Sequence, residues 1–126
     1  MAEQLGDLQL LVMGVVWEMG NATVAEAHQR LLKKRSIAYT TVLSTLRNLE
    51  RRGYLEHTVE GKAHRFYPGV SRDAHTSASV HSLIQNLFGG RPERLMSHLL
   101  GNERVDARAI ERIRTLLTDT EEGARR

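Results

Sequence analysis

Residues 37–52, IAYTTVLSTLRNLERR, combine an apolar stripe with a polar face at the spacing of an α-helix. Val42, Leu46 and Leu49 recur at i, i+4 and i+7, which places them on one side of a helix. The other side carries hydroxyl, amide and guanidinium groups and no acid, and such groups read base edges or hold phosphates. The residues of this polar face are Thr40, Ser44, Arg47, Asn48 and Arg51. We interpret the stretch as a DNA recognition helix; the alternative is a polar surface helix without a partner.

Charge is unevenly distributed along the chain. Residues 1–29 carry four acids and no Lys or Arg, residues 30–72 carry ten bases and three acids, and residues 73–126 carry eight of each. The formal net charge of +3 therefore conceals a basic segment around the helix. Such a segment is typical of polyanion binding, because each phosphate that is neutralised releases a counterion. A membrane surface is a poorer match, since the charged helix face lacks apolar anchor residues.

Length and composition narrow the class of protein further. A chain of 126 residues has room for one compact domain, or for a small domain with an oligomerisation segment. The absence of Cys excludes disulfides, thiolate metal sites and a Cys nucleophile, and it suits a reducing compartment. The longest apolar run, residues 8–17, is interrupted by Gln9 and Gly14 and is too short to span a bilayer. We expect a soluble cytoplasmic protein with no membrane partner.

Two helices are predicted before the recognition helix. Asp7 is the expected cap of the first, and Gly20 its end. Thr23 and Glu26 have the spacing of a capping box, which opens a second helix. Trp17 is expected to be a packing residue. The predicted buried residues are Leu8, Leu11, Val12, Val15, Val16 and Met19 in the first helix, and Val24, Ala27 and Leu31 in the second.

After Gly53 the apolar residues recur at every second position instead of at helical spacing. Residues 55–60 alternate apolar with polar side chains, Gly61 supplies a turn, and residues 62–67 return as a second strand that ends at Pro68. Three helices followed by a β-hairpin predict a winged helix-turn-helix, in which the hairpin is the wing. Lys62 and Arg65 lie on this wing and are expected to contact the DNA backbone. The alternative role for both is to keep an exposed hairpin soluble.

Residues 71–126 are predicted to form a helical dimerisation domain that follows a winged-helix domain in residues 1–70. Three apolar stripes recur at helical spacing, separated by Gly89-Gly90 and Gly101-Asn102, and Asp106 is the expected cap of the last helix. So short a segment cannot bury three wide apolar faces by itself, which favours a homodimer over a monomer that folds back on itself. The residues expected at the dimer interface are Leu83, Leu87, Leu95, Leu99, Leu100, Ile110, Ile113 and Leu117.

Three segments of the chain resemble the BlaI/MecI/CopY family of bacterial repressors, also called penicillinase repressors. The segments are LGDLQLLVMGVVWEMGNATVAEA at 5–27, AYTTVLSTLRNLERRGYLEH at 38–57 and GKAHRFYPGVSRD at 61–73. The resemblance implies a mainly α fold with a winged helix and a helical dimerisation domain. It implies a repressor that binds double-stranded DNA at an inverted-repeat operator. By position, it implies DNA contacts for Thr40, Thr41, Ser44 and Arg47 on the helix and for Lys62 and Arg65 on the wing.

Departures from the family bear on the inducing signal. Copper-responsive members carry Cys-x-Cys pairs, and this sequence has no Cys, so a copper thiolate switch is excluded. Members that respond to β-lactams are released when a regulatory protease cuts them, and the resemblance implies that route here. Ile37-Ala38-Tyr39 replaces a Trp-Ser-Pro pattern found in two antibiotic-resistance repressors, so we expect a different operator half-site.

An enzyme is the main competing class. The six His residues form no zinc-protease motif, and no nucleophile elbow, phosphate loop or dinucleotide pattern occurs. His57 and His64 can face each other across the hairpin, but two imidazoles without further ligands are more often solvated or near phosphate. We therefore expect no catalytic residues, no metal and no cofactor. A winged-helix protein-interaction module and a ligand-responsive regulator of another class stay as alternatives, and the acid-free helix face argues against the first.

Overall fold

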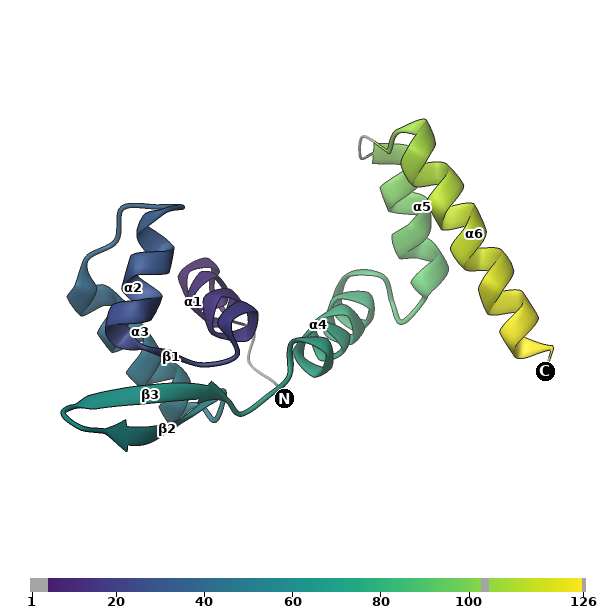
Figure 1. The fold of residues 1–126 in the computed structure, drawn as a ribbon. Helices are drawn as coiled ribbons and strands as arrows, with labels where there is room; N and C mark the ends of the chain where they lie inside the picture. Colours follow the sequence, from purple (N-terminus) through teal and green to yellow (C-terminus); the bar gives the residue numbers. More distant parts are fainter. Residues whose placement is uncertain (1–4, 103–104, 126) are drawn as a thin grey trace. The chain divides into compact units, whose positions relative to one another are not determined.

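The computed structural model of the protein describes residues 5–102 and 105–125. In these ranges the protein is mainly helical with one small antiparallel sheet, which confirms the predicted fold class (Figure 1). The chain divides into two compact units after Val80, and each is described by itself. The elements of the first unit, with the helix that crosses the division, are α1 (Asp7–Met19), β1 (Ala22–Thr23), α2 (Val24–Leu32), α3 (Tyr39–Arg51), β2 (Leu55–Glu60), β3 (Ala63–Pro68) and α4 (Arg72–Leu87).

The buried stripe of the first helix differs from the predicted one, because Leu8, Leu11 and Met19 are only half-buried and pack against the core. Val12, Val15 and Val16 are buried as expected, and Met13, which lies outside the predicted stripe, is buried as well. Gly20, with a φ of 86°, ends α1 as predicted. The predicted Asp7 cap is wrong. Gly6 takes the N-cap position and its backbone N–H donates to Oε1 of Gln9 at 2.9 Å, while Asp7 is the first helical residue, where its charge complements the helix dipole.

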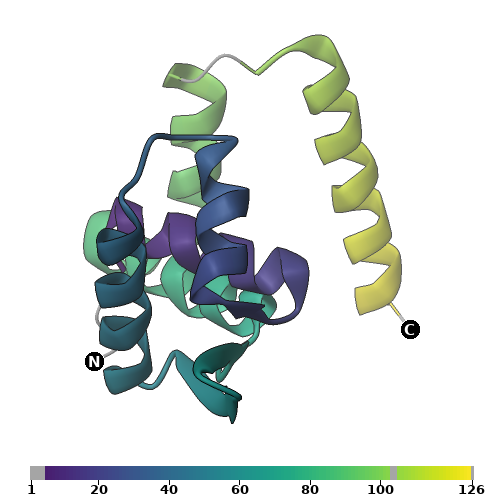
Figure 2. The same cartoon turned by 60° about the vertical axis from the view of Figure 1, so that its left-hand side comes forward.

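The second helix begins at the predicted capping box. The backbone N–H of Glu26 donates to the Thr23 hydroxyl at 3.2 Å, and the backbone N–H of Thr23 donates to the Glu26 carboxylate at 2.9 Å. Val24, Ala27 and Leu31 are buried, as predicted. α2 and α3 lie side by side (Figure 1 and Figure 2). The capping box therefore fixes the start of the helix against which α3 packs.

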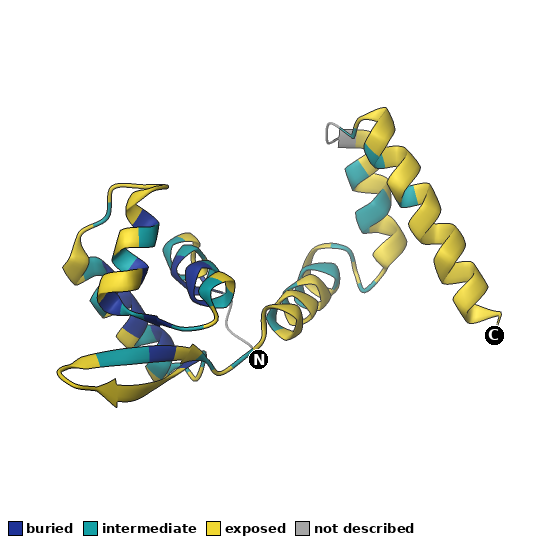
Figure 3. Cartoon of the chain, viewed as in Figure 1, coloured by how far each residue is buried: buried dark blue, intermediate teal, exposed yellow. Residues whose placement is uncertain are grey.

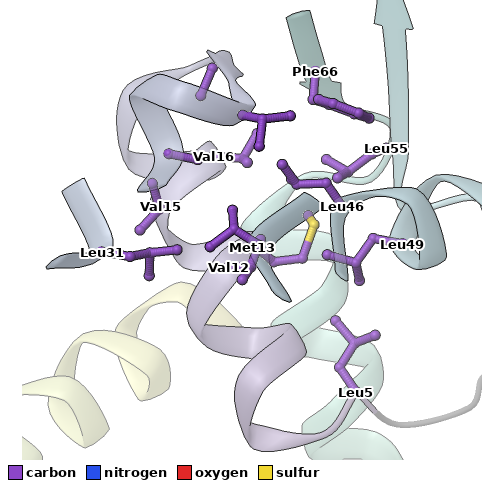
Figure 4. Packing of buried hydrophobic residues seen from close by; sticks show 14 residues of the cluster. Leu5, Val12, Met13, Val15, Val16, Leu31, Leu46, Leu49, Leu55 and Phe66 are labelled. Atoms are coloured by element: carbon purple, nitrogen blue, oxygen red, sulfur yellow. The ribbon is translucent and has the colours of Figure 1, made fainter. Parts of the chain in front are cut away.

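The third helix occupies all but the ends of the predicted stretch. Val42, Leu46 and Leu49 have no exposed surface, which confirms the predicted apolar stripe. Thr45 is also buried, and its hydroxyl donates to the Thr41 carbonyl oxygen at 2.7 Å, so its burial leaves no polar group without a partner. The core joins side chains from every element of the winged helix (Figure 4). Its buried residues are Leu5, Val12, Met13, Val15, Val16, Ala22, Val24, Ala27, Leu31, Val42, Leu46, Leu49, Leu55 and Phe66.

The hairpin is present as predicted, but it belongs to a larger sheet. β2 and β3 are antiparallel and joined by a turn at Gly61, where φ is 63°. β1 pairs with β3 and gives the order β1-β3-β2, a strand that the sequence analysis missed because two residues show no periodicity. Lys62, expected in the second strand, lies in the turn, and Pro68, expected to follow that strand, is its last residue.

Three helices follow the wing, in agreement with the three apolar stripes. After α4, α5 spans Pro92–Asn102 and α6 spans Ala107–Ala124. Asp106 caps α6 as predicted, since its carboxylate accepts the backbone N–H of Ala109 at 2.8 Å. Gly101 was expected to separate the last two helices but lies inside α5, where a Gly in the final turn is tolerated. The predicted break thus falls later, in a connection that includes residues 103–104, outside the described ranges.

The three C-terminal helices carry apolar faces that are left open. Of the described residues from 72 to 125, none is buried (Figure 3). The residues predicted for the dimer interface divide into a half-buried group, Leu83, Leu95, Leu99 and Ile113, and an exposed group, Leu87, Leu100, Ile110 and Leu117. The most exposed is Leu87, at 72%. No helix in the described ranges is long and apolar enough to cross a membrane.

Phe66 ties the wing to the core, and its removal is expected to destabilise the protein. Phe66→Ala deletes a fully buried aromatic side chain of β3 and should lower the free energy of unfolding by about 3–5 kcal/mol. Val59→Ala, on the neighbouring strand and 69% exposed, should change it by less than about 0.5 kcal/mol. Urea denaturation followed by circular dichroism measures both. Equal effects would show that the wing folds independently of the core.

Candidate nucleic-acid interface

The outward face of α3 carries four of the five predicted polar residues. Thr40, Ser44, Arg47 and Arg51 are exposed. The Ser44 hydroxyl donates to the Thr41 carbonyl oxygen at 3.1 Å, which leaves its oxygen able to accept a hydrogen bond from a base edge. Thr41, which the family resemblance assigns to DNA, is half-buried at the edge of this face. The structure thus brings hydroxyl and guanidinium groups together on one exposed face of α3, and such groups can read base edges.

Asn48 does not lie on that outward face. Its side-chain oxygen accepts a hydrogen bond from Nε2 of Gln9 at 2.7 Å, and the residue is half-buried against α1. Gln9 in turn accepts from the Arg52 guanidinium at 3.0 Å, so one amide joins α1 to the last turn of α3 and to its C-cap residue. The prediction that Asn48 faces outward is therefore wrong. Asn48 lies at the border between the buried stripe and the outward face, where the Gln9 side chain of α1 reaches it.

A hollow of about 510 Å³ separates α3 from the wing. It is lined by Thr40, Leu43, Ser44, Arg47, Glu50, Arg51, His57 and His64. A second hollow, of about 240 Å³, lies between the wing turn and the starts of α2 and α3. Its lining includes Lys62, an exposed residue of the turn. Lys62 therefore lies on the wing, as predicted, but in its turn and beside the polar face of α3.

Arg65 is held within the protein instead of pointing to solvent. Its guanidinium donates to the carboxylates of Glu60 at 2.5 Å and Glu26 at 2.7 Å, and to the side-chain oxygen of Asn21 at 2.9 Å. The bonds to Glu60 and then Glu26 raise the pKa of Arg65 above its ordinary range. The prediction that it contacts the DNA backbone is not supported by this geometry, because two acids on β2 and α2 already neutralise its charge. These contacts make Arg65 a strut between the wing and α2.

The two His residues of the hairpin lie diagonally and not directly across from each other. His57 is opposite Phe66 in the register and His64 is opposite Val59. The imidazoles are stacked, with centroids 4.3 Å apart and an angle of 11° between the planes. Nδ1 of His57 contacts the Glu50 carboxylate, which joins the base of the wing to α3. Among the described residues no group of three or more His, Cys, Asp or Glu side chains has the arrangement of a metal site.

Gln9 and Glu50 are the positioning residues that sequence reasoning did not identify. In the sequence, Gln9 only interrupts an apolar run, and Glu50 lies in the recognition helix without an assigned role. Their partners Asn48 and His57 lie 39 and 7 positions away in the chain. The contact between Glu50 and His57 spans the turn between α3 and β2. An acid before that turn and a His after it form the one sequence signal that could have indicated this contact.

A three-helix unit with a β-hairpin wing, and an acid-free polar face on the third helix, defines the winged-helix class of DNA-binding proteins. Residues 5–119 match the penicillinase repressor family. The transcriptional regulator BlaI of Mycobacterium tuberculosis (strain H37Rv) is 31% identical over 122 residues, which cover 95% of this chain and 87% of that relative. The chain belongs to the penicillinase repressor family, which confirms the family resemblance seen in the sequence.

Two solved structures agree with this assignment. The DNA-binding domain of the repressor BlaI matches with a TM-score of 0.52 and 26% identity, covering 59% of this chain and 93% of that one. The monomeric form of Bacillus licheniformis BlaI in complex with the blaP half-operator matches with a TM-score of 0.50 and 26% identity, covering 57% and 88%. The protein is thus a DNA-binding transcriptional repressor, and its family is one of repressors and not of enzymes.

The Arg65 strut is expected to weaken in acid. The backbone N–H of Thr23, and then the Arg65 guanidinium, lower the pKa of Glu26 below its ordinary value of 4.5. In the interval between the folded and unfolded pKa values the unfolded chain binds more protons, so stability rises with pH there. The contribution of Glu26 is complete above about pH 4.5 and is lost as pH falls through the lower, folded pKa.

Glu26→Gln keeps the capping side chain but removes this titration. The variant should be slightly less stable than the wild type at pH 7, and its stability should fall less steeply below pH 4.5. The effect is small because 44% of the Glu26 side chain is exposed and solvent screens the pair. Urea titrations from pH 3 to 7 measure it, with Glu56→Gln on the exposed side of β2 as the control. Parallel pH profiles for the wild type and Glu26→Gln would contradict the assignment.

Proposed function

We propose that this repressor binds an inverted-repeat operator as a homodimer, with α3 of each copy in the major groove of one half-site. The observation that carries the proposal is the exposed, acid-free face of α3, which lies between two hollows beside the wing. The Bacillus licheniformis relative was solved as a monomer on a half-operator, and a half-operator belongs to an operator with two halves. Two-fold symmetric DNA is read most simply by a two-fold symmetric protein.

The exposed side chains of α3 divide into two roles under this proposal. Thr40 and Ser44 present short hydroxyls near the middle of the face, and these suit contacts to base edges. Arg47 and Arg51 carry long guanidinium groups that reach guanine or a phosphate on either side. Thr41, half-buried at the edge, is assigned to the DNA backbone. Asn48 and Arg65 are instead assigned to positioning, because their side chains are already bonded within the protein.

The homodimer is assigned to the C-terminal helices. Leu100 and Leu117 are 55% and 58% exposed, and Leu87 more so. Apolar side chains at helical spacing on three helices, with none of the described residues buried, favour burial against a second copy. The winged helix, in contrast, already has a closed core of its own. We assign residues 1–70 to DNA binding and 71–126 to dimerisation, with the start of α4 packed on the winged helix.

Loss of the dimer is the proposed route by which repression ends. Two linked half-site contacts gain avidity from the effective concentration of the second binding unit, and separation can cost a factor of about 100 or more. A protease that cuts α4–α6 would separate the copies without altering a residue of α3. The released winged helix would keep weak, salt-sensitive binding to a half-site.

Ser44 and Lys62 are expected to differ in what they do for affinity. Ser44→Ala should weaken binding to the operator by about 1–3 kcal/mol and leave binding to random DNA almost unchanged, because it removes a base contact. Lys62→Ala should weaken both alike and reduce the slope of log K against log salt by about one unit, because it removes a phosphate contact. Gel-shift titrations on an operator selected from random DNA measure both. Equal losses on the two DNAs for Ser44→Ala would remove it from the base-reading set.

Leu117→Asp is expected to give a folded monomer. A carboxylate at this exposed position of α6 would be buried without a partner in the dimer, whereas the monomer leaves it in water. Operator affinity should fall about 100-fold while half-site affinity is unchanged. Sedimentation equilibrium and gel shifts measure these, with Thr118→Asp, exposed on the same helix turn, as the control for added charge. A dimer that survives both Leu117→Asp and Leu100→Asp would place the interface elsewhere.

A further inference from the structure

The start of α4 is attached to the winged helix by a cluster of rings and polar contacts that the DNA-binding face does not use. We call this cluster the α4 joint. Its members are Gly14, Trp17, Tyr54, Val70, Arg72 and His75, all within the first compact unit. None of the six belongs to the buried core, which is closed by other residues. The joint therefore has a structural task other than completing that core.

The segment that leads into α4 is held by α1. Nε1 of Trp17 donates to the carbonyl oxygen of Val70 at 2.8 Å, across 53 positions of sequence. The indole also packs on the core, so its position is fixed from that side. A buried indole N–H usually finds a partner, and here the partner is the backbone of the segment leading into α4. The backbone just before α4 is therefore held in place against α1.

His75, one turn into α4, lies between two rings of the winged helix. Its imidazole centroid is 5.7 Å from the ring of Trp17 at an angle of 38°, and 5.6 Å from the ring of Tyr54 at an angle of 80°. Trp17 comes from α1 and Tyr54 from the turn after α3. The rings restrict rotation of α4 about its own axis, because any rotation would carry the imidazole out of both contacts.

Arg72 adds two further contacts from the first turn of α4. Its guanidinium carbon lies 5.5 Å from the centre of the Trp17 ring, and its Nη2 donates to the carbonyl oxygen of Gly14 at 3.3 Å. A planar guanidinium over an indole is the preferred cation–π geometry. Three contacts to α1 and one to Tyr54 thus hold the first turns of α4 in position and in rotation.

We propose that the α4 joint is a positioning element that fixes the direction in which α4 leaves the winged helix, and so sets the half-site spacing that the repressor accepts. This inference rests on the proposed homodimer. α4 continues without a break to Leu87 and carries Leu83 and Leu87, which are assigned to the dimer interface. Linked binding is strong only where the linker lets both units reach their sites together. A rigid α4 joint holds the two winged helices of the dimer at one separation. A flexible joint lets them adopt several separations.

The test varies the joint and the spacer of the operator together. An inverted repeat selected from random DNA by the wild-type full chain is compared with repeats whose spacer is lengthened by two and by five base pairs, and with a single half-site. His75→Ala removes both ring contacts of the imidazole. His75→Phe restores an aromatic ring as the rescue variant. His81→Ala, exposed on the same helix, is the matched control.

The wild type and His81→Ala should prefer the selected spacer strongly. His75→Ala should bind that operator about tenfold more weakly and bind the three spacers with affinities within about threefold of one another. Its half-site affinity and its dimerisation by sedimentation should equal those of the wild type, and His75→Phe should recover the spacer preference. Arg72→Ala alters an exposed residue and should behave like His75→Ala. It provides the test if His75→Ala does not fold.

Two results would overturn the inference. One is an unchanged spacer preference in His75→Ala and Arg72→Ala, which would mean that the joint does not control spacing. The other is an equal loss on the half-site and on the full operator, which would mean that the joint only supports the fold. Failure of the proposed function is distinguishable, because the wild type itself would then select no inverted repeat, or bind it no more tightly than a half-site.

Discussion

Burial of three apolar side chains of α3 fixes the orientation of the polar surface that we propose to face DNA. Val42, Leu46 and Leu49 have no exposed surface, and each contributes about 1.5–3 kcal/mol relative to an exposed position. Because a helix has 3.6 residues per turn, holding this stripe against the core turns Ser44 and Arg47 outward. Burial of this stripe is therefore enough to orient the polar face. Its residues can change with the operator while the core keeps the helix in place.

A few long-range polar contacts then refine the positions of α3 and the wing. Gln9 bonds to Asn48 near the end of α3, Glu50 contacts His57 at the base of the wing, and Arg65 joins the wing to α2. Each contact removes a polar or charged group from the set available to DNA. The basic charge in residues 30–72 therefore overstates the charge that can meet phosphate, since Arg65 already lies between two acids.

Most of the fold follows from local patterns, whereas part of the site does not. Thr23 and Glu26 are three residues apart, so the capping box is visible in the sequence, and the α3 stripe spans only two turns. The exposed positions of Thr40 and Ser44, which we propose to contact DNA, follow from the same stripe. Asn48 and Arg65 have partners 39 positions away, and no local rule predicts which polar residue finds a distant one. Asn48 sits at the border of the stripe, where periodicity cannot choose between water and the neighbouring helix.

The short strand β1 changes how the wing can move. Ala22 and Thr23 pair with Phe66 and Arg65 on β3, so the inner strand of the wing is bonded on both of its edges while β2 is bonded on one. An opening motion of β3 must therefore break contacts to the start of α2, which makes β3 part of the same cooperative unfolding unit as the helices. β2 can fray alone. The rate of amide hydrogen exchange should therefore differ between the two strands of the wing, slow along β3 and fast along the outer strand. A DNA backbone placed against the wing would meet one rigid strand and one more flexible strand.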